Sequence, residues 1–114
     1  MAPRVELLWW RGCPSWDRAL EELRESTREA GLDPQAIEVR EIVNEQSAEQ
    51  ERFVGSPTIL IDGEDVQPPP ADEPIGLTCR IYRLRDGRVS PIPDPADVRD
   101  ALKRAIDSPK RKER

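Results

Sequence analysis

A single cysteine stands where an apolar run meets an amphipathic one, and a thiol in that position can act as a nucleophile. Residues 5–10 are apolar apart from Glu6, and Cys13-Pro14 follows shortly after them. Proline suits the first position of a helix, because its missing N–H would have no partner there, so the sequence predicts Cys13 as the N-cap. The positive end of a helix favours the thiolate, which is the reactive form of cysteine. We therefore expect a solvent-reachable thiol at the start of a helix.

The strength of this activation follows from simple magnitudes. A free thiol must have its pKa lowered by about 1.5 to be half ionised at neutral pH, which requires ~2 kcal/mol. A helix N-terminus supplies roughly 0.3 to 1 kcal/mol and occasionally about 2 kcal/mol. Arg11 adds to this stabilisation, whereas Asp17 and the three nearby indoles oppose it by charge and desolvation. The sequence thus predicts a moderately activated thiol.

Composition excludes several classes of function. The chain has no histidine, so serine–histidine and cysteine–histidine hydrolases are excluded. The formal net charge of -5 repels phosphate backbones, and we expect no nucleic-acid partner. No cofactor is expected.

The two cysteines and the lack of a long apolar stretch indicate a compartment. No segment of the sequence reaches the length of a membrane span, and residues 5–10 are too few for the apolar core of a signal peptide. We expect a cytoplasmic protein with no membrane partner. Thiols stay reduced in that compartment, so a bridge between Cys13 and Cys79 would be functional.

Hydrophobic spacing and turn residues divide the remaining chain into alternating strands and helices. Asn44 is a suitable N-cap for a short polar helix, and Asp94-Pro95 is suitable for the start of an amphipathic one. The expected elements are a strand at 5–10, a helix at 14–31, a strand near Ile37 and Val39, a helix at 44–52, a strand at 58–61, a proline-rich loop at 67–74, a hairpin of 79–84 and 88–92, and a helix from 94.

This order resembles the thioredoxin-like superfamily over residues 4–107. Cys13 and Pro57 match the active cysteine and the cis-proline of that family, whereas Trp16 replaces the second cysteine of its Cys-x-x-Cys motif. The resemblance implies an α/β fold: one domain over 1–107 whose mixed sheet of about four strands, in the order 2-1-3-4, is flanked by helices. Residues 108–114 are expected to be a disordered basic tail. A vicinal dithiol is impossible.

The closest resemblance is to small bacterial thioredoxin-fold proteins that are often labelled alkylmercury-lyase-like, through Gly-Cys-Pro at 12–14, Gly-Ser-Pro-Thr at 55–58 and Gly-Leu-Thr-Cys-Arg at 76–80. It implies that a cis-Pro57 exposes the backbone of Ser56, on which an extended peptide or glutathione can pair as a strand. Cys79 is either the partner of Cys13 or a space-filling residue beside Ile81. The candidate catalytic residues are Cys13 and Cys79, and the candidate substrate-binding residues are Trp10, Arg11, Pro14, Ser56 and Pro57. Trp9 and Trp16 are interpreted as core residues rather than as a substrate platform.

Three functions remain open. The leading hypothesis is a thiol–disulfide protein in which Cys13 attacks a disulfide-containing protein or low-molecular-weight disulfide, and Cys79 or an outside thiol resolves the product. The second is mercury or organomercurial binding by Cys13 and Cys79. In the family a proton-donating aspartate stands where this chain has Trp16, so Asp17 is a weak substitute and binding without cleavage is favoured. The third is an interaction module without activity.

Overall fold

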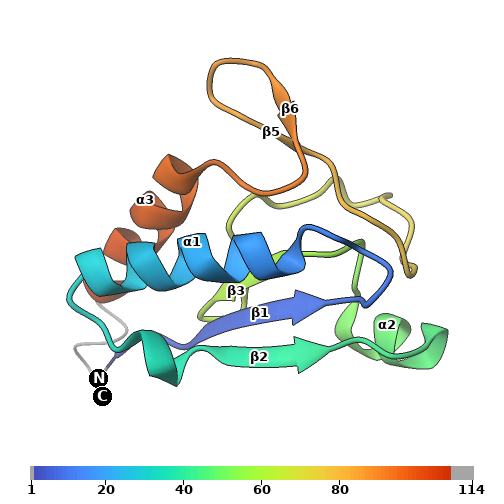
Figure 1. Cartoon of the computed structure of the whole chain (residues 1–114), viewed down its shortest axis with the longest axis horizontal. Coiled ribbons are helices and arrows are strands. Elements are labelled where there is room, and N and C mark those ends of the chain that lie inside the picture. Colours follow the sequence, from blue (N-terminus) through green and yellow to red (C-terminus); the bar gives the residue numbers. More distant parts are fainter. Residues whose placement is uncertain (1, 109–114) are drawn as a thin grey trace.

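Strand β1 (Val5–Trp9) is central in the computed structural model, which describes residues 2–108. It pairs in parallel with β2 (Glu38–Glu41) and antiparallel with β3 (Thr58–Ile61), and β3 pairs antiparallel with β4 (Glu64–Asp65). The sheet order β2-β1-β3-β4 agrees with the predicted order 2-1-3-4. The fold is therefore an α/β domain with a four-stranded mixed sheet (Figure 1).

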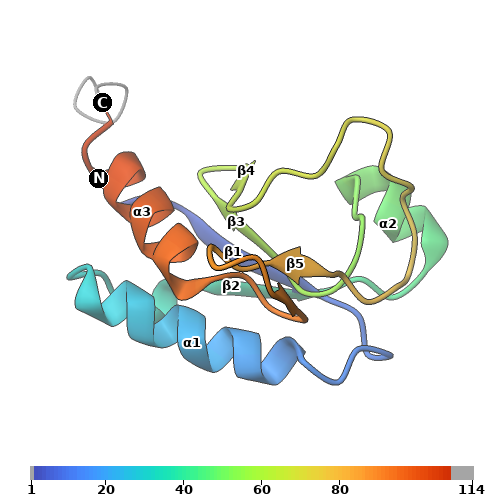
Figure 2. The same ribbon diagram turned by 90° about the horizontal axis from the view of Figure 1, so that it is seen from above.

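The two faces of this sheet are buried against different helices. Helices α1 (Trp16–Glu29) and α3 (Pro95–Ile106) pack on one face, together with the side chains of Val5 and Leu7. Figure 2 shows α3 crossing over β1, with α1 running next to α3. The short helix α2 (Glu45–Glu51) lies on the other face and contributes Ala48 to a small second cluster. Because side chains alternate along a strand, a run that is apolar on both sides is expected for β1.

The helix ends show which local predictions hold. The side chain of Asn44 accepts the N–H of Ser47 and caps α2, and that of Asp94 caps α3 by accepting the N–H of Ala96, as predicted. The prediction for α1 is wrong by two residues, because its N-cap is Ser15, not Cys13.

The chain before α1 therefore makes one further turn before it becomes helical. The first helical bond ends on the Ser15 carbonyl, which accepts the N–H of Ala19 at 3.1 Å. Pro14 accordingly precedes the N-cap instead of occupying the first helical position. At the other end α1 stops at Glu29, and Gly31 has the positive φ of 82° that favours glycine beyond a helix.

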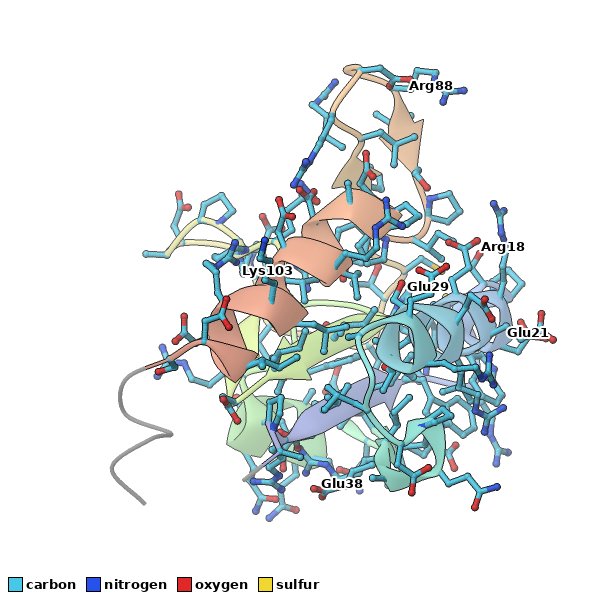
Figure 3. All side chains as sticks on the ribbon, turned by 90° about the vertical axis from the view of Figure 1, so that its left-hand side faces the viewer. Arg18, Glu21, Glu29, Glu38, Arg88 and Lys103 are labelled. Carbon is cyan, nitrogen blue, oxygen red and sulfur yellow. The ribbon has the colours of Figure 1, made fainter. Side chains whose placement is uncertain are left out.

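A 3-10 turn, η1 (Pro34–Ala36), leads into β2, and the predicted hairpin forms a separate two-stranded sheet. Its strands, β5 (Tyr82–Arg83) and β6 (Val89–Ser90), are shorter than the expected 79–84 and 88–92. Figure 1 shows the hairpin projecting above the main sheet, and Figure 3 shows the side chain of Arg88 at its tip. The segment 67–74 has no regular structure, as its prolines predict.

Among residues 2–108, no helix has the length and apolar character needed to cross a membrane. The predicted basic tail lies outside the described residues except for Ser108. Trp9 and Trp16 stack with ring centroids 4.1 Å apart and pack on the α1 side of the sheet, in agreement with their interpretation as core residues.

Candidate functional site

The loop from β1 to α1 buries Cys13 instead of exposing it. Cys13 is 2% exposed and lies three positions before the first residue of α1. Its N–H donates to the carbonyl oxygen of Trp10 at 3.0 Å, which closes a turn. A side chain at Gly12 would have its Cβ 2.3 Å from the Trp10 ring, so only glycine fits under this indole. The expectation of a solvent-reachable thiol at the N-cap is therefore wrong.

Ser56 connects this loop to the turn that precedes β3. The Ser56–Pro57 peptide bond is cis, as the family resemblance implied. The Ser56 hydroxyl accepts the N–H of Trp10 at 3.0 Å, and the Ser56 carbonyl oxygen accepts the thiol of Cys13 at 3.3 Å. Ser56 and Pro57 are both fully buried. The sulfur of Cys13 is thus fixed against the backbone of the cis peptide.

The chain's own segment 78–80 occupies the backbone of Ser56. The N–H of Ser56 donates to the Thr78 carbonyl at 2.8 Å, and the N–H of Arg80 donates to the Ser56 carbonyl at 2.9 Å. These bonds make a parallel bridge between Ser56 and Cys79. The prediction that Ser56 offers a free edge to a substrate peptide is therefore wrong, because that edge is already paired.

Gly55 makes this close docking possible. A Cβ at Gly55 would stand 3.1 Å from Cβ and 3.2 Å from both Cα and N of Arg80, and its φ of 149° is one that other residues rarely adopt. The requirement for glycine here comes from the approach of another backbone. Because Gly55 has no side chain, segment 78–80 can lie directly against the cis peptide.

This docking brings Cys79 to Cys13 across 66 positions of sequence (79 − 13). Both cysteines are free, and Cys79 is exposed where Cys13 is buried. Desolvation and the neighbouring Cys13 together raise the pKa of the Cys79 thiol above that of a free thiol. The two thiols are therefore close enough to interact, and Cys13 is buried whereas Cys79 is exposed to solvent.

A buried guanidinium anchors the same segment from its other side. Arg80 is 8% exposed, and its two terminal nitrogens donate to the Asp65 carboxylate at 2.6 and 3.2 Å. They also donate to the Thr58 hydroxyl at 3.2 Å and to the Gln67 carbonyl at 2.5 Å. The guanidinium lies 4.5 Å from the ring centroid of Tyr82. A buried charge requires such complete pairing. The bonds of the Arg80 side chain also fix the segment that carries Cys79 to β3, to β4 and to the start of the proline-rich loop.

Tyr82 completes this support. Its hydroxyl donates to the carbonyl oxygen of Pro57 at 2.5 Å, and its ring is 1% exposed. Burial raises the pKa of the phenol, so Tyr82 remains a neutral hydrogen-bond donor. Residues 56–57 are consequently held by Tyr82, by segment 78–80 and by the β1–α1 loop.

A groove of about 640 Å³ opens beside Cys79. One wall is the extended segment 78–83, and the other is the proline-rich loop, with Pro68, Pro69, Pro70, Glu73 and Pro74. Figure 2 shows this loop passing over the end of the molecule at which α2 lies. The exposed thiol thus faces a recess that can receive a molecule of peptide size.

The remaining predicted residues do not converge on the two sulfurs. Trp10 packs against the second apolar cluster on the α2 side. Arg11 is exposed and pairs with Glu41 at 3.3 Å, and Pro14 is exposed. The carboxylate of Asp17 is exposed and accepts the N–H of Arg18 at 2.9 Å.

Sequence reasoning missed Arg80 and its carboxylate partner Asp65. Arginine and aspartate are rarely buried, and no pattern in the residues next to either one indicates that they pair. One signal was present: an arginine directly beside a cysteine and two positions from a tyrosine, in a strand whose side chains alternate between two faces. The buried face of that alternation holds Arg80 and Tyr82, and the open face holds Cys79 and Ile81.

No protein-family model, curated protein or solved structure matches this chain. Within residues 2–108, no three histidine, cysteine, aspartate or glutamate side chains are grouped so as to hold a metal ion. The geometry of the two thiols is therefore the main guide to function.

Proposed function

We propose that this chain is a thiol–disulfide exchange protein whose redox couple is Cys13 with Cys79. The observation that carries the proposal is the convergence of both cysteines on Ser56 beside the cis peptide: the Cys13 thiol donates to the Ser56 carbonyl, Ser56 is bridged to Cys79, and Cys13 raises the pKa of Cys79. Two cysteines that are both held against the same residue need little backbone movement to form a bridge. The resemblance of Cys13 and Pro57 to the active cysteine and cis-proline of thioredoxin-like proteins supports the same function.

Burial assigns the order of the two thiols. Cys13 is 2% exposed and its thiol is bonded to the Ser56 carbonyl, whereas Cys79 is exposed. A substrate disulfide must reach the attacking sulfur, and only Cys79 meets that condition without movement of the chain. The raised pKa of Cys79 lowers its thiolate fraction tenfold for each pKa unit, but the thiolate that does form is more nucleophilic, so the attack is slowed by less than this factor. Cys79 is therefore the attacking thiol and Cys13 the resolving thiol, the reverse of the order expected from the sequence.

The exchange balances in two steps. The Cys79 thiolate attacks one sulfur of the substrate disulfide, forms a mixed disulfide and releases the other substrate sulfur as a thiolate, which takes up a proton. Cys13, after losing its proton, then attacks the Cys79 sulfur, closes the intramolecular bridge and releases the second substrate thiol. The substrate disulfide is reduced, the protein pair is oxidised, and two equivalents of a low-molecular-weight thiol restore it.

Single-serine variants test the assignment. After reaction with a small disulfide, the Cys13→Ser variant should retain a stable mixed disulfide on Cys79, because the resolving thiol is missing. The Cys79→Ser variant should retain far less adduct, because the remaining thiol is buried. Intact-mass measurement detects the adduct on each variant, and its loss after addition of a thiol shows that it is a disulfide. A stable adduct on Cys79→Ser with none on Cys13→Ser would reverse the roles, and adducts on neither would refute the proposal.

Binding of a soft metal ion is the second candidate function, and the same contact of two thiols favours it. Paired thiolates are good ligands for mercury(II). Cleavage of an organomercurial is not supported, because Asp17 is exposed and its carboxylate is bonded to the neighbouring Arg18 N–H. Incubation with phenylmercury separates the possibilities: a stable adduct that needs both cysteines indicates sequestration, and released benzene indicates a lyase.

A further inference from the structure

The segment that carries the attacking thiol also presents an unpaired strand edge. Side chains in 79–83 alternate, so that Cys79, Ile81 and Arg83 are exposed and line the groove, whereas Arg80 and Tyr82 are buried. Ile81 is 78% exposed, which is unusual for a large apolar side chain. One face of the segment therefore displays a thiol, an apolar side chain and a cation at intervals of two residues.

The backbone groups of the same segment are divided between two edges. On the first edge, the N–H of Arg80 bonds to Ser56, and Tyr82 pairs with Ser90 of β6. On the second edge, the N–H of Arg83 donates to the Gln67 side-chain oxygen at 3.3 Å, and the Arg83 carbonyl accepts the Gln67 amide at 3.2 Å. The Gln67 side chain thus occupies the place of a neighbouring strand at one position only.

Further along this second edge the backbone has no partner. Neither the N–H of Cys79 nor the N–H and C=O of Ile81 hydrogen-bonds to any residue in 2–108, and the Cys79 carbonyl meets only the Thr78 hydroxyl, at 3.5 Å. The facing wall explains this opening. Its prolines at 68, 69 and 70 have no N–H to donate, so the loop cannot pair with 79–81 as a strand.

We propose that the groove binds an extended, cysteine-bearing peptide of a disulfide-containing protein, which adds as a strand to the edge of Cys79 and Ile81. This inference rests on the proposed function and names its substrate class. Main-chain bonds to Ile81 hold the peptide in register, while the prolines and the Ile81 side chain receive an apolar residue next to the peptide's cysteine. The peptide's sulfur then lies opposite Cys79.

Charge adds a second element of recognition. Arg83 lines the groove and donates to the Gly87 carbonyl at 2.8 Å, but no carboxylate within 2–108 pairs with it. It stands four residues from Cys79, roughly 13 Å along an extended chain. The preferred peptide therefore carries an acidic side chain about four positions from its cysteine. Glu73 on the opposite wall disfavours further acidic residues.

The probe for this inference is a synthetic peptide rich in β-branched residues, whose single cysteine is a mixed disulfide with 2-thiopyridine. A glutamate is placed four positions before or after the cysteine. Attack by Cys79 releases pyridine-2-thione, which is followed by absorbance, and closure by Cys13 then releases the peptide thiol. The rate of the first step is compared with the rate for 2,2′-dithiodipyridine, a disulfide with no backbone.

Two changes test the strand edge, each read as the ratio of peptide rate to small-disulfide rate. Ile81→Pro removes one unpaired N–H and should lower the ratio about fivefold, as expected for the loss of one net hydrogen bond. N-methylation of the peptide at the position facing Ile81 should lower it similarly and needs no change in the protein. Val89→Ala, on the exposed hairpin outside the groove, is the control and should leave the ratio unchanged.

Arg83→Gln should lower the rate of the glutamate peptide about threefold and leave that of the matched glutamine peptide unchanged, in the range for an exposed ion pair. If neither Ile81→Pro nor N-methylation changes the ratio of peptide rate to small-disulfide rate, the inference is overturned, whether or not the peptide thiol is later released. Failure of the wild-type chain to release the peptide thiol would instead refute closure by Cys13, and with it the proposed function.

Discussion

Oxidation of the pair should stabilise the folded chain by a predictable amount. A bridge between Cys13 and Cys79 closes a loop of 66 positions (79 − 13), and the loss of chain entropy in the unfolded state corresponds to about 4 kcal/mol. Ser56 holds both segments, because its carbonyl accepts the Cys13 thiol and its backbone is bonded to residues 78 and 80, so the bridge needs little distortion of the native structure. We therefore expect most of this stabilisation to appear in the free energy of unfolding.

Urea unfolding of the oxidised and the reduced chain measures it. With a denaturant slope of about 2 kcal/mol per molar, 4 kcal/mol moves the midpoint by about 2 M. The Cys79→Ser variant is the control, because its midpoint should not respond to oxidant. Equal midpoints for the two forms of the wild-type chain, or a lower midpoint for the oxidised form, would show that the bridge strains the fold and would refute the geometry described for the pair.

Three further predictions concern the residues around the pair. Because the pKa of Cys79 is raised, its alkylation rate should keep rising tenfold for each pH unit beyond about pH 8.5, where a free thiol levels off. Cys13→Ser should move this profile to lower pH, because Cys13 opposes ionisation of Cys79; a plateau near pH 7.5 in the wild-type chain would contradict this. Tyr82→Phe leaves the buried carbonyl of the cis peptide without its donor and should cost about 1 to 3 kcal/mol in urea unfolding, whereas a change within 0.5 kcal/mol would show that this bond is dispensable. Gly55→Ala should push the backbone of Arg80 away and slow closure of the disulfide at unchanged Cys79 alkylation, and normal closure would show that the close approach is not needed.

The sequence predicted those features that depend on local chemistry. The caps at Asn44 and Asp94 are properties of a few adjacent residues, and the structure confirms them. The sheet order came from the family resemblance and is confirmed. The cis state of the peptide before Pro57 came from the family resemblance and is confirmed.

The features that the sequence did not predict all depend on contacts between distant segments. Cys13 is buried and its thiol is bonded to Ser56, 43 positions away, and no pattern near residue 13 indicates this. Arg80 is buried because Asp65 neutralises it across 15 positions, contrary to the usual exposure of arginine. The open strand edge at Ile81 results from the facing prolines, which the sequence indicated only as a stiff loop.

The most direct test of the pairing is the product of mild oxidation at low protein concentration. The geometry predicts a monomer that has lost two hydrogen atoms in mass and that yields, after proteolysis, one disulfide-linked peptide pair containing Cys13 and Cys79. An exposed Cys79 with no partner within reach would instead link two copies of the chain, and a covalent dimer as the main product would contradict the pairing.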